Sequence, residues 1–238
     1  MSPFSLTRFD SDQELAQSAA AAWLRELGAG SGGSPYCVAL SGGRIARRFF
    51  AAVANLAKAG SGALSRVHYF WGDERCVPPT DPESNFRLAR ELLLQPLMVP
   101  EQRTHRIFGE QEPETAAAAA AAELGRVAPA RVNRQPVLDL VFLGMGEDGH
   151  VASLFPGEAE NVTASPAVYR AVTATKPPPR RITLGYAAIA AARDVWVLAS
   201  GAGKEKALRD SLAPSGNTPL ARVLKLRQGT RIFTDIAG

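Results

Sequence analysis

Residues 137–150 read VLDLVFLGMGEDGH, and this stretch decides the fold. Its first half, 137–143, is an almost uninterrupted apolar run that holds one charged residue, Asp139. Such a run between polar loops is typical of a central parallel strand that is covered on both faces. Its second half, 144–150, is polar and rich in glycine. In an open parallel sheet ligands bind at the carboxyl ends of the strands, so the stretch predicts a buried strand that leads into a binding site.

On both sides of this strand, short apolar segments alternate with longer alanine-rich segments. We expect further strands at residues 36–40, 67–71, 168–172, 182–184, 195–200 and 231–234. We expect helices from residue 10 or 11 to 27, from the glycines at 42–43 to about Lys58, and at 84–94, 115–127 and 204–212. The alternation predicts an α/β fold in one domain, residues 1–238: an open, mostly parallel, doubly wound (Rossmann-like) sheet with helices on both faces.

The composition argues against several classes of protein. Of the 238 residues, 46% are hydrophobic, which is enough for a sizeable core. A total of 27 basic residues against 23 acidic residues gives a net charge of +4, and this small excess is not concentrated in one run of Lys or Arg. We therefore expect no nucleic-acid partner, because such proteins usually carry a basic face or tail. A mildly positive chain suits a small anionic substrate.

Two cysteines, Cys37 and Cys76, are too few for a disulfide framework, which predicts free thiols in a reducing compartment. Residues 1–12 lack the pattern of a secretory signal, and the longest alanine run, 116–122, is too short to span a bilayer. The tract 28–35, rich in glycine and serine, predicts a flexible surface connection. We therefore expect a cytoplasmic protein with no membrane partner.

The segment Ser41-Gly42-Gly43-Arg44 joins a predicted strand to a predicted helix. Its two glycines let the backbone approach a ligand closely, and the helix N-terminus directs free N–H groups at an anion. Arg44 can add a charged contact. Neither the Walker motif nor the dinucleotide fingerprint is present, so a lone phosphate fits better than a nucleotide. A plain turn is the alternative that this segment alone leaves open.

The segment Gly72-Asp73-Glu74-Arg75 places two carboxylates and a guanidinium after another predicted strand. Adjacent side chains point in different directions, so one carboxylate can face a cleft while the other holds Arg75 or a helix terminus. Arg75 offers a planar donor fork to phosphate or carboxylate, and Ser84-Asn85 can add neutral hydrogen bonds. The alternative is a structural ion pair at a strand end.

The segment 144–150 ends in His150, two residues after Asp148. Neutral imidazole is the natural general base near pH 7, and Asp148 can orient it or bind a sugar hydroxyl. His68 lies in a strand and is expected to be packed, whereas His105 lies in a polar loop and is expected to be solvated. The histidines and cysteines show no metal-ligand spacing, so we expect no metal. Ser153 follows closely, but the chain lacks the Gly-x-Ser-x-Gly elbow of many serine hydrolases.

Two further segments carry positive charge. Gly201-Ala202-Gly203-Lys204 again joins a strand to a helix, and Lys204 can reach a phosphate as a compact charge, although surface lysines are commoner than ligand lysines. The run 176–181 reads KPPPRR and predicts a stiff, positive loop. This loop either forms a rim over the substrate or is solvated.

Together these segments resemble the 6-phosphogluconolactonases, which belong to the same superfamily as the glucosamine-6-phosphate deaminases. The resemblance runs from about Leu40 to Leu212. The motifs that carry it are Leu40-Ser41-Gly42-Gly43, Trp71-Gly72-Asp73-Glu74-Arg75 with Ser84-Asn85-Phe86, the segment 143–156, Arg181-Ile182-Thr183-Leu184 and Gly203-Lys204-Glu205-Lys206. The Asp-Glu-Arg motif with its Ser-Asn pair and the Gly-Met-Gly-x-Asp-Gly-His segment make the resemblance specific.

The resemblance implies that the chain hydrolyses the lactone of a sugar phosphate, 6-phosphogluconolactone, in the pentose phosphate pathway. It implies that His150 is the general base on the attacking water, with no cofactor, no metal and no partner beyond the substrate, in a monomer or small homo-oligomer. The substrate contacts that it implies are Ser41, Gly42, Gly43, Arg75 and Lys204 at the phosphate, Asp73, Asn85 and Asp148 around the sugar ring, and Gly146 and Arg181 elsewhere in the site. Many relatives continue the first motif as Ser-Thr-Pro or Arg-Thr-Pro, where this chain has Arg44-Ile45-Ala46. A hydroxyl that supports the phosphate is therefore missing, and Arg44 can substitute for it.

Two alternatives stand beside this expectation. An isomerising deaminase of an amino-sugar phosphate needs a carboxylate and a histidine, and Asp73 and His150 could fill these roles. However, Glu74-Arg75 after Asp73 resembles the lactonases, since the deaminases generally carry an aromatic residue at the third position. A non-enzymatic sugar-phosphate sensor is the second alternative, and the presence of His150 argues against it.

Overall fold

The computed structural model describes residues 3–29, 33–57 and 62–236. Six strands form its central sheet: β1 Phe4–Arg8, β2 Tyr36–Leu40, β3 Val67–Trp71, β7 Leu140–Gly144, β10 Asp194–Ala199 and β11 Thr230–Thr234. Their order is β1-β11-β10-β7-β2-β3, and each strand pairs in parallel with its neighbours. The expected parallel sheet is confirmed. The middle of the connection 28–35 and the predicted helix end at Lys58 lie outside the described residues.

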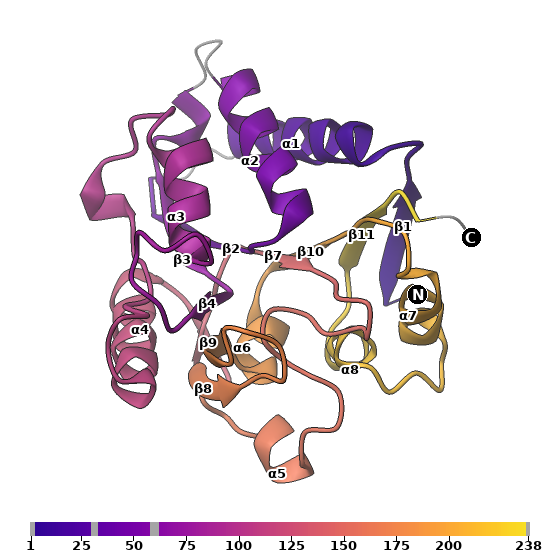
Figure 1. Ribbon diagram of the computed structural model, residues 1–238. Helices are drawn as coiled ribbons and strands as arrows, with labels where there is room; N and C mark the ends of the chain where they lie inside the picture. The colour runs from indigo at the N-terminus through magenta and orange to yellow at the C-terminus, as the bar shows by residue number, and fades with distance from the viewer. Residues whose placement is uncertain (1–2, 30–32, 58–61, 237–238) are drawn as a thin grey trace.

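Helices cover both faces of this sheet, as expected (Figure 1). On one face, α1 (Asp12–Ala29) and α2 (Arg44–Ala57) pack against each other. On the other face lie α6 (Tyr186–Ala191) and α8 (Pro219–Leu226). No helix in the described part of the chain combines the length and the apolar character needed to cross a membrane.

The core lies around the central strand β7. The ring centroid of Phe142 in β7 is 5.2 Å from that of Trp23 in α1, 4.6 Å from that of Phe49 in α2 and 5.7 Å from that of Trp196 in β10. All four side chains are buried. Aromatic side chains bury the largest areas of any residue type, so this cluster fixes β7 firmly against its neighbours. The loop that follows Gly144 therefore starts from a rigid base.

A second, three-stranded sheet lies beside the first, formed by β4 (Asp73–Arg75), β9 (Arg180–Leu184) and β8 (Tyr169–Thr173) in this order. Both of its pairings are antiparallel. The expectation that residues 168–172 and 182–184 belong to the parallel sheet is therefore wrong. Only six residues connect β8 to β9, and a connection without a crossover helix permits antiparallel pairing alone.

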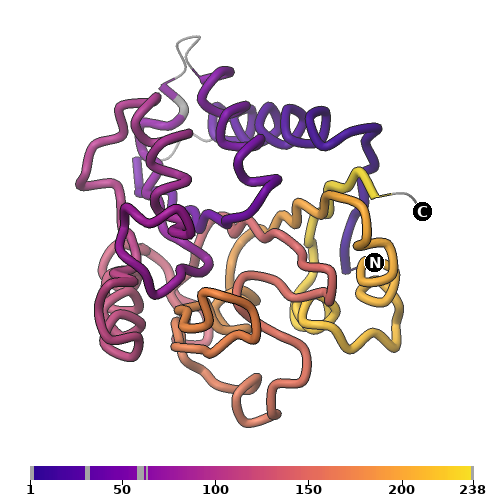
Figure 2. Tube along the Cα trace, in the orientation of Figure 1, coloured from indigo at the N-terminus to yellow at the C-terminus, as the bar shows by residue number. Residues whose placement is uncertain are grey.

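The other elements complete the fold with small shifts from the predicted bounds. The predicted helix 84–94 divides into α3 (Asn85–Ala89) and a π-helical turn (Arg90–Leu94). The remaining elements are α4 Pro113–Val127, α5 Glu160–Thr163, α7 Glu205–Leu212, the 3₁₀ turns Gly62–Leu64 and Glu101–Arg103, and the small antiparallel pair β5 Arg131–Val132 and β6 Gln135–Pro136. Figure 2 shows that the first and last described segments run side by side. Sequence patterns missed β1, β4, the pair β5 and β6, α5, α6 and α8.

The expectation that His105 is solvated is also wrong. Its side chain is only 5% exposed and stacks on the ring of Phe70. Its Nε2 lies 2.9 Å from Nδ1 of His68, and its Nδ1 lies 2.7 Å from Oε1 of Glu123 in α4. His105 follows Thr104, which bridges to Tyr69 at the free edge of β3, so the polar loop is held against the sheet and carries the imidazole inward. His68 is partly buried against it, as expected.

Candidate active site

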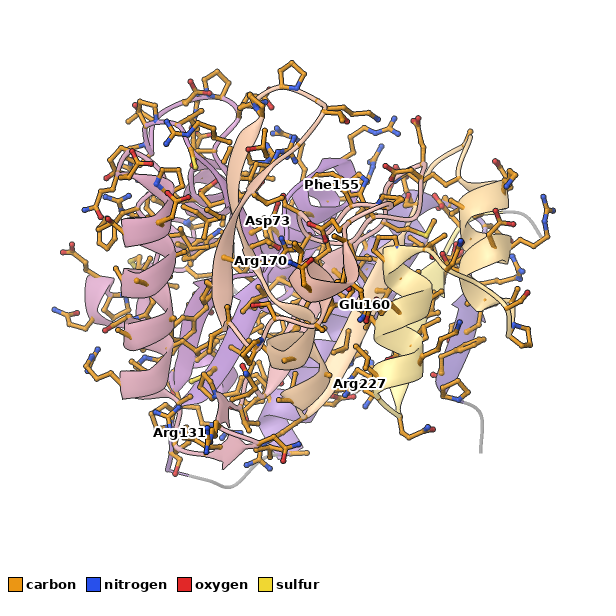
Figure 3. The ribbon with its side chains drawn as sticks, turned by 90° about the horizontal axis from the view of Figure 1, so that it is seen from below. Asp73, Arg131, Phe155, Glu160, Arg170 and Arg227 are labelled. Atoms are coloured by element: carbon orange, nitrogen blue, oxygen red, sulfur yellow. The ribbon has the colours of Figure 1, made fainter. Side chains whose placement is uncertain are left out.

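One pocket of about 250 Å³ opens where the carboxyl ends of β2, β7 and β10 meet β4. Of the predicted site residues, only Asp148 is absent from its walls. The lining comprises Ser41, Gly42, Gly43, Arg44, Ile45, Asp73, Arg75, Asn85, Gly144, Met145, Gly146, Glu147, His150, Ala152, Lys176, Arg181, Ser200 and Lys204. In Figure 3, Asp73 lies toward this end of the strands, whereas Arg131 and Arg227 lie toward the other end.

The loop after β7 folds into a compact turn that presents His150 to the pocket. The backbone N–H of Gly146 donates to the carbonyl of His150, at 2.9 Å. A side chain at position 146 would collide with the imidazole, because a Cβ there would lie 2.0 Å from its ring atoms. Gly149 has a φ of +78°, in the region that favours glycine. The glycines of this loop are therefore needed for the position of the imidazole.

Asp148 orients His150 and does not line the pocket. Its Oδ1 lies 2.6 Å from Nδ1 of His150 and accepts a second hydrogen bond, of 3.1 Å, from the His150 backbone N–H. Burial raises the pKa of Asp148, but these bonds from His150 outweigh burial, and the pKa lies below its usual value. An ionised carboxylate at Nδ1 keeps the proton on that nitrogen and leaves Nε2 as the acceptor. This tautomer is the one that a general base requires.

The two adjacent carboxylates of β4 point in different directions. Glu74 is 2% exposed and accepts hydrogen bonds from the backbone N–H groups of Asn85 and Phe86 at the start of α3, both at 2.8 Å. It also accepts from the Ser84 hydroxyl and from the N–H of Arg75. Burial raises the pKa of Glu74 above its usual value. Glu74 thus fixes the helix that carries Asn85, while Asp73 faces the pocket.

Asp73 is held by two side chains. The amide of Asn85 donates to its Oδ1 at 3.2 Å and to its backbone carbonyl at 2.9 Å, and the hydroxyl of Ser153 donates to its Oδ2 at 2.7 Å. Gly42 lies directly against Asn85, because a Cβ at position 42 would lie 1.9 Å from Oδ1 of the amide. The turn after β2 is therefore in direct contact with Asn85, which in turn bonds to Asp73 of β4.

The pocket is electropositive. Five of its lining residues are basic, Arg44, Arg75, Lys176, Arg181 and Lys204, whereas two, Asp73 and Glu147, are acidic. Burial and the nearby Arg75 lower the pKa of Arg181, and burial and the nearby Arg44 lower the pKa of Lys204. Like charges repel one another, and an anionic ligand would relieve the repulsion among these side chains.

The segment 41–43 is a glycine turn that joins β2 to α2. Gly43 has a φ of +92°, and α2 begins at the next residue, so the N–H groups of the first turn of α2 have no partner within the helix. The hydroxyl of Ser41 accepts a 3.1 Å hydrogen bond from the N–H of Gly144, which ties the end of β2 to the end of β7. Lys204 follows β10, and its Nζ donates to the carbonyl of Met145, the residue after β7, at 2.6 Å.

Sequence reasoning missed part of the lining: Ile45, Met145, Glu147, Ala152 and Ser200. Ser200 was the most accessible of these to prediction, because it ends the strand predicted at 195–200. Its hydroxyl donates to Oδ2 of Asp235 at 2.9 Å, and the N–H of Gly201 donates to Oδ1 of the same residue. Asp235 therefore fixes the turn that leads to Lys204. Lys176, in the proline-rich loop, also lines the pocket, which places this loop at the rim.

Residues 10–233 match the model of the glucosamine-6-phosphate isomerases/6-phosphogluconolactonase family. The chain belongs to this family. It is 37% identical over 213 residues to the 6-phosphogluconolactonase of Streptomyces coelicolor, with 86% of this chain and 82% of the relative aligned. It is 38% identical over 191 residues to that of Treponema pallidum, with 78% and 74% aligned.

Solved structures of the family share the fold. The 6-phosphogluconolactonase of Trypanosoma brucei superposes with a TM-score of 0.84 and 30% identity, over 97% of this chain and 95% of that chain. A monomeric glucosamine-6-phosphate deaminase superposes with a TM-score of 0.80 at 18% identity, over 98% of this chain and 97% of that chain. The second likeness extends to the fold alone. No group of three His, Cys, Asp or Glu side chains suited to a metal ion occurs within residues 3–29, 33–57 and 62–236.

Proposed function

We propose that the chain hydrolyses 6-phosphoglucono-1,5-lactone to 6-phosphogluconate, the lactonase step of the oxidative pentose phosphate pathway. The observation that carries the proposal is the His150–Asp148 pair at the wall of an electropositive pocket. The family and its lactonase relatives support it. Hydrolysis of a phosphorylated lactone needs a base for water and positive charge for the phosphate, and the pocket offers both.

In the proposed mechanism, Nε2 of His150 accepts a proton from a water molecule as its oxygen attacks the lactone carbonyl. Asp148 stabilises the imidazolium that forms, through its bond to Nδ1. The tetrahedral oxyanion is stabilised by the positive lining of the pocket. Its collapse breaks the bond to the ring oxygen, which takes up the proton from His150 and becomes the 5-hydroxyl. The immediate product is a carboxylic acid, which releases its proton to the solvent near neutral pH to give the carboxylate, and His150 returns to its neutral form.

The proposed phosphate subsite lies between two strand ends. Gly42, Gly43 and the start of α2 offer backbone N–H groups, and Lys204 and Arg75 offer charge from the facing walls. Arg44 also lines this pocket, which fits the idea that it replaces the missing hydroxyl of other relatives. Asp73 and Asn85 are proposed to face the hydroxyls of the sugar ring.

The experiment is a hydrolysis assay with freshly prepared lactone. Proton release and 6-phosphogluconate formation should greatly exceed the spontaneous rate, and glucosamine 6-phosphate given to the same preparation should release no ammonia. A rate equal to the spontaneous rate would exclude the lactonase, and ammonia release would favour the isomerising deaminase. Retained binding without turnover would favour a sugar-phosphate sensor.

We also propose that the enzyme acts in the cytoplasm on a small-molecule substrate, as one domain in a monomer or small homo-oligomer. Cys37 is buried and Cys76 is partly buried, and both are free thiols, which fits a reducing compartment. Sedimentation at several protein concentrations measures the oligomeric state directly.

A further inference from the structure

Ser153 stands out because it is fully buried and yet bonded to a carboxylate of the pocket wall. Its 2.7 Å hydrogen bond to Oδ2 of Asp73 joins residues that lie 80 positions apart in the chain. Ser153 itself does not line the pocket. A nucleophile must reach the substrate, so this burial excludes Ser153 from that role and leaves its hydroxyl as a donor to Asp73.

Asn85, the second side chain that donates to Asp73, differs from Ser153 in its place relative to the pocket. Asn85 lines the pocket although it is only 2% exposed, and its amide is shared between the carboxylate and the backbone carbonyl of Asp73. Ser153 is shielded from substrate and solvent, and its bond to Asp73 is therefore available in both the empty and the occupied site. A hydrogen bond to a charged group in a buried place is worth more than one in water, because the unpaired group would be costly to bury.

The backbone around Ser153 is fixed from two sides. Its N–H donates to Oγ1 of Thr183 at 3.2 Å, and Thr183 lies opposite Asp73 in the register of β4 and β9. Ser153 lies within a turn that is closed by the bridge between Val151 and Leu154. Within this turn Ala152 has a φ of +50°, a conformation that a non-glycine residue keeps only where its surroundings hold it.

The same short turn follows directly after His150. The segment that presents the general base thus also supplies the donor that sets the orientation of Asp73, because Ser153 follows His150 by only three positions. We infer that Ser153 is a positioning residue, which holds the Asp73 carboxylate toward the substrate hydroxyls and couples its placement to that of His150. The inference rests on the proposed function.

The test is a double-mutant cycle with Ser153→Ala, Asp73→Ala and the double variant, read out as the Kd for 6-phosphogluconate by calorimetry. Removing the serine hydroxyl should weaken binding about tenfold in the presence of Asp73, the size expected for one hydrogen bond to a charged group. In the Asp73→Ala background the same change should have almost no effect, because the hydroxyl then has no carboxylate to orient.

Thr163→Val is the matched control, since it removes another buried hydroxyl, which donates to the carbonyl of Glu160 in α5. It should leave the Kd unchanged, and thermal unfolding of each variant checks that all are folded. An equal loss of affinity from Ser153→Ala with and without Asp73 would show that Ser153 acts on the fold in general, and the inference would be wrong.

Steady-state kinetics supply an independent readout. Ser153→Ala should raise KM more than it lowers kcat. A loss of kcat as large as that of His150→Ala would make Ser153 a reacting group and overturn the inference.

The lactonase function and the positioning role of Ser153 can be tested separately. A wild-type protein that binds 6-phosphogluconate but does not hydrolyse the lactone refutes the lactonase, and the binding cycle still decides the role of Ser153. A wild type that binds no 6-phosphogluconate overturns both.

Discussion

At the scale of single residues, the imidazole of His150 has one nitrogen bonded to Asp148 and the other available to a ligand. His150→Asn should therefore lower kcat by about 10²–10⁴, the usual contribution of a general base, with little change in KM. Asp148→Asn should lower kcat as well, because an amide that donates to Nδ1 would force the proton onto Nε2. Stopped-flow proton release measures both. An unchanged kcat in a folded His150→Asn protein would exclude His150 as the base.

Lys204 gives a second prediction at this scale, on the effect of pH. Burial and Arg44 lower the pKa of Lys204, so the ammonium loses its proton at a lower pH than an ordinary lysine does. The affinity for 6-phosphogluconate should be full below this lowered pKa and should fall as the pH rises through it. Lys204→Arg should move the fall to higher pH, because guanidinium stays charged. Calorimetry from neutral to alkaline pH tests this; the same pH dependence in both proteins would remove Lys204 from the phosphate site.

The residue scale also shows how far the sequence could predict the site. From strand-end position and residue type, the sequence predicted that Asp73, Glu74 and Asp148 lie near the site. These two criteria could not assign a separate role to each carboxylate. The roles depend on where each side chain points: Asp73 into the pocket, Glu74 onto the start of α3, and Asp148 onto His150. No local sequence pattern could predict the contact between Ser153 and Asp73, because the two residues lie 80 positions apart in the chain.

At the scale of elements, the imidazoles of His68 and His105 join β3 to α4 through Glu123. Burial lowers the pKa of both histidines, so the folded protein binds their protons less readily than the unfolded chain does. The free energy of unfolding should therefore fall as the pH drops below about 6.5, the ordinary histidine value. A hydrogen bond from Arg126 holds the pKa of Glu123 at about 2, so this carboxylate stays ionised in that range.

Urea unfolding at pH 7.5 and pH 5.5 measures this effect. His105→Gln is the control, because its amide can bond to the same neighbours and does not titrate, and it should show a weaker dependence on pH. If the wild type and His105→Gln lost equal stability between these pH values, the pair would not be the cause.

Elements with a strong periodic signal could be predicted, and those defined by distant partners could not. The bounds of β2 and β3 agree with the expectation, because each strand is an apolar run between breakers. β1 lies at the sheet edge, is mostly exposed, and pairs with residues 230–234, so nothing within its own five residues indicates a strand. α8 has only eight residues, and unlike α7, which is equally short, it does not follow a predicted strand.

At the scale of the whole molecule, the positive pocket predicts a linkage between ligand and stability. 6-Phosphogluconate at about 100 times its Kd should stabilise the protein by about 2.7 kcal/mol and raise Tm by roughly 5–10 °C. Gluconate, which lacks the phosphate, should have a much smaller effect at the same concentration. Differential scanning calorimetry compares the two, and equal shifts would show that the pocket does not recognise the phosphate.

The position of β11 in the sheet has a consequence for co-translational folding. β11 lies between β1 and β10, so among the described strands the earliest made is bound only by the latest made. Until residues 230–234 leave the exit tunnel, the nascent chain holds β1 without a partner and β10 with an open edge, and such edges invite aggregation. Asp235, which steadies the turn before Lys204, arrives later still. The pocket is therefore complete only after residues 230–235 have left the exit tunnel, and a chaperone would be of most use before that happens.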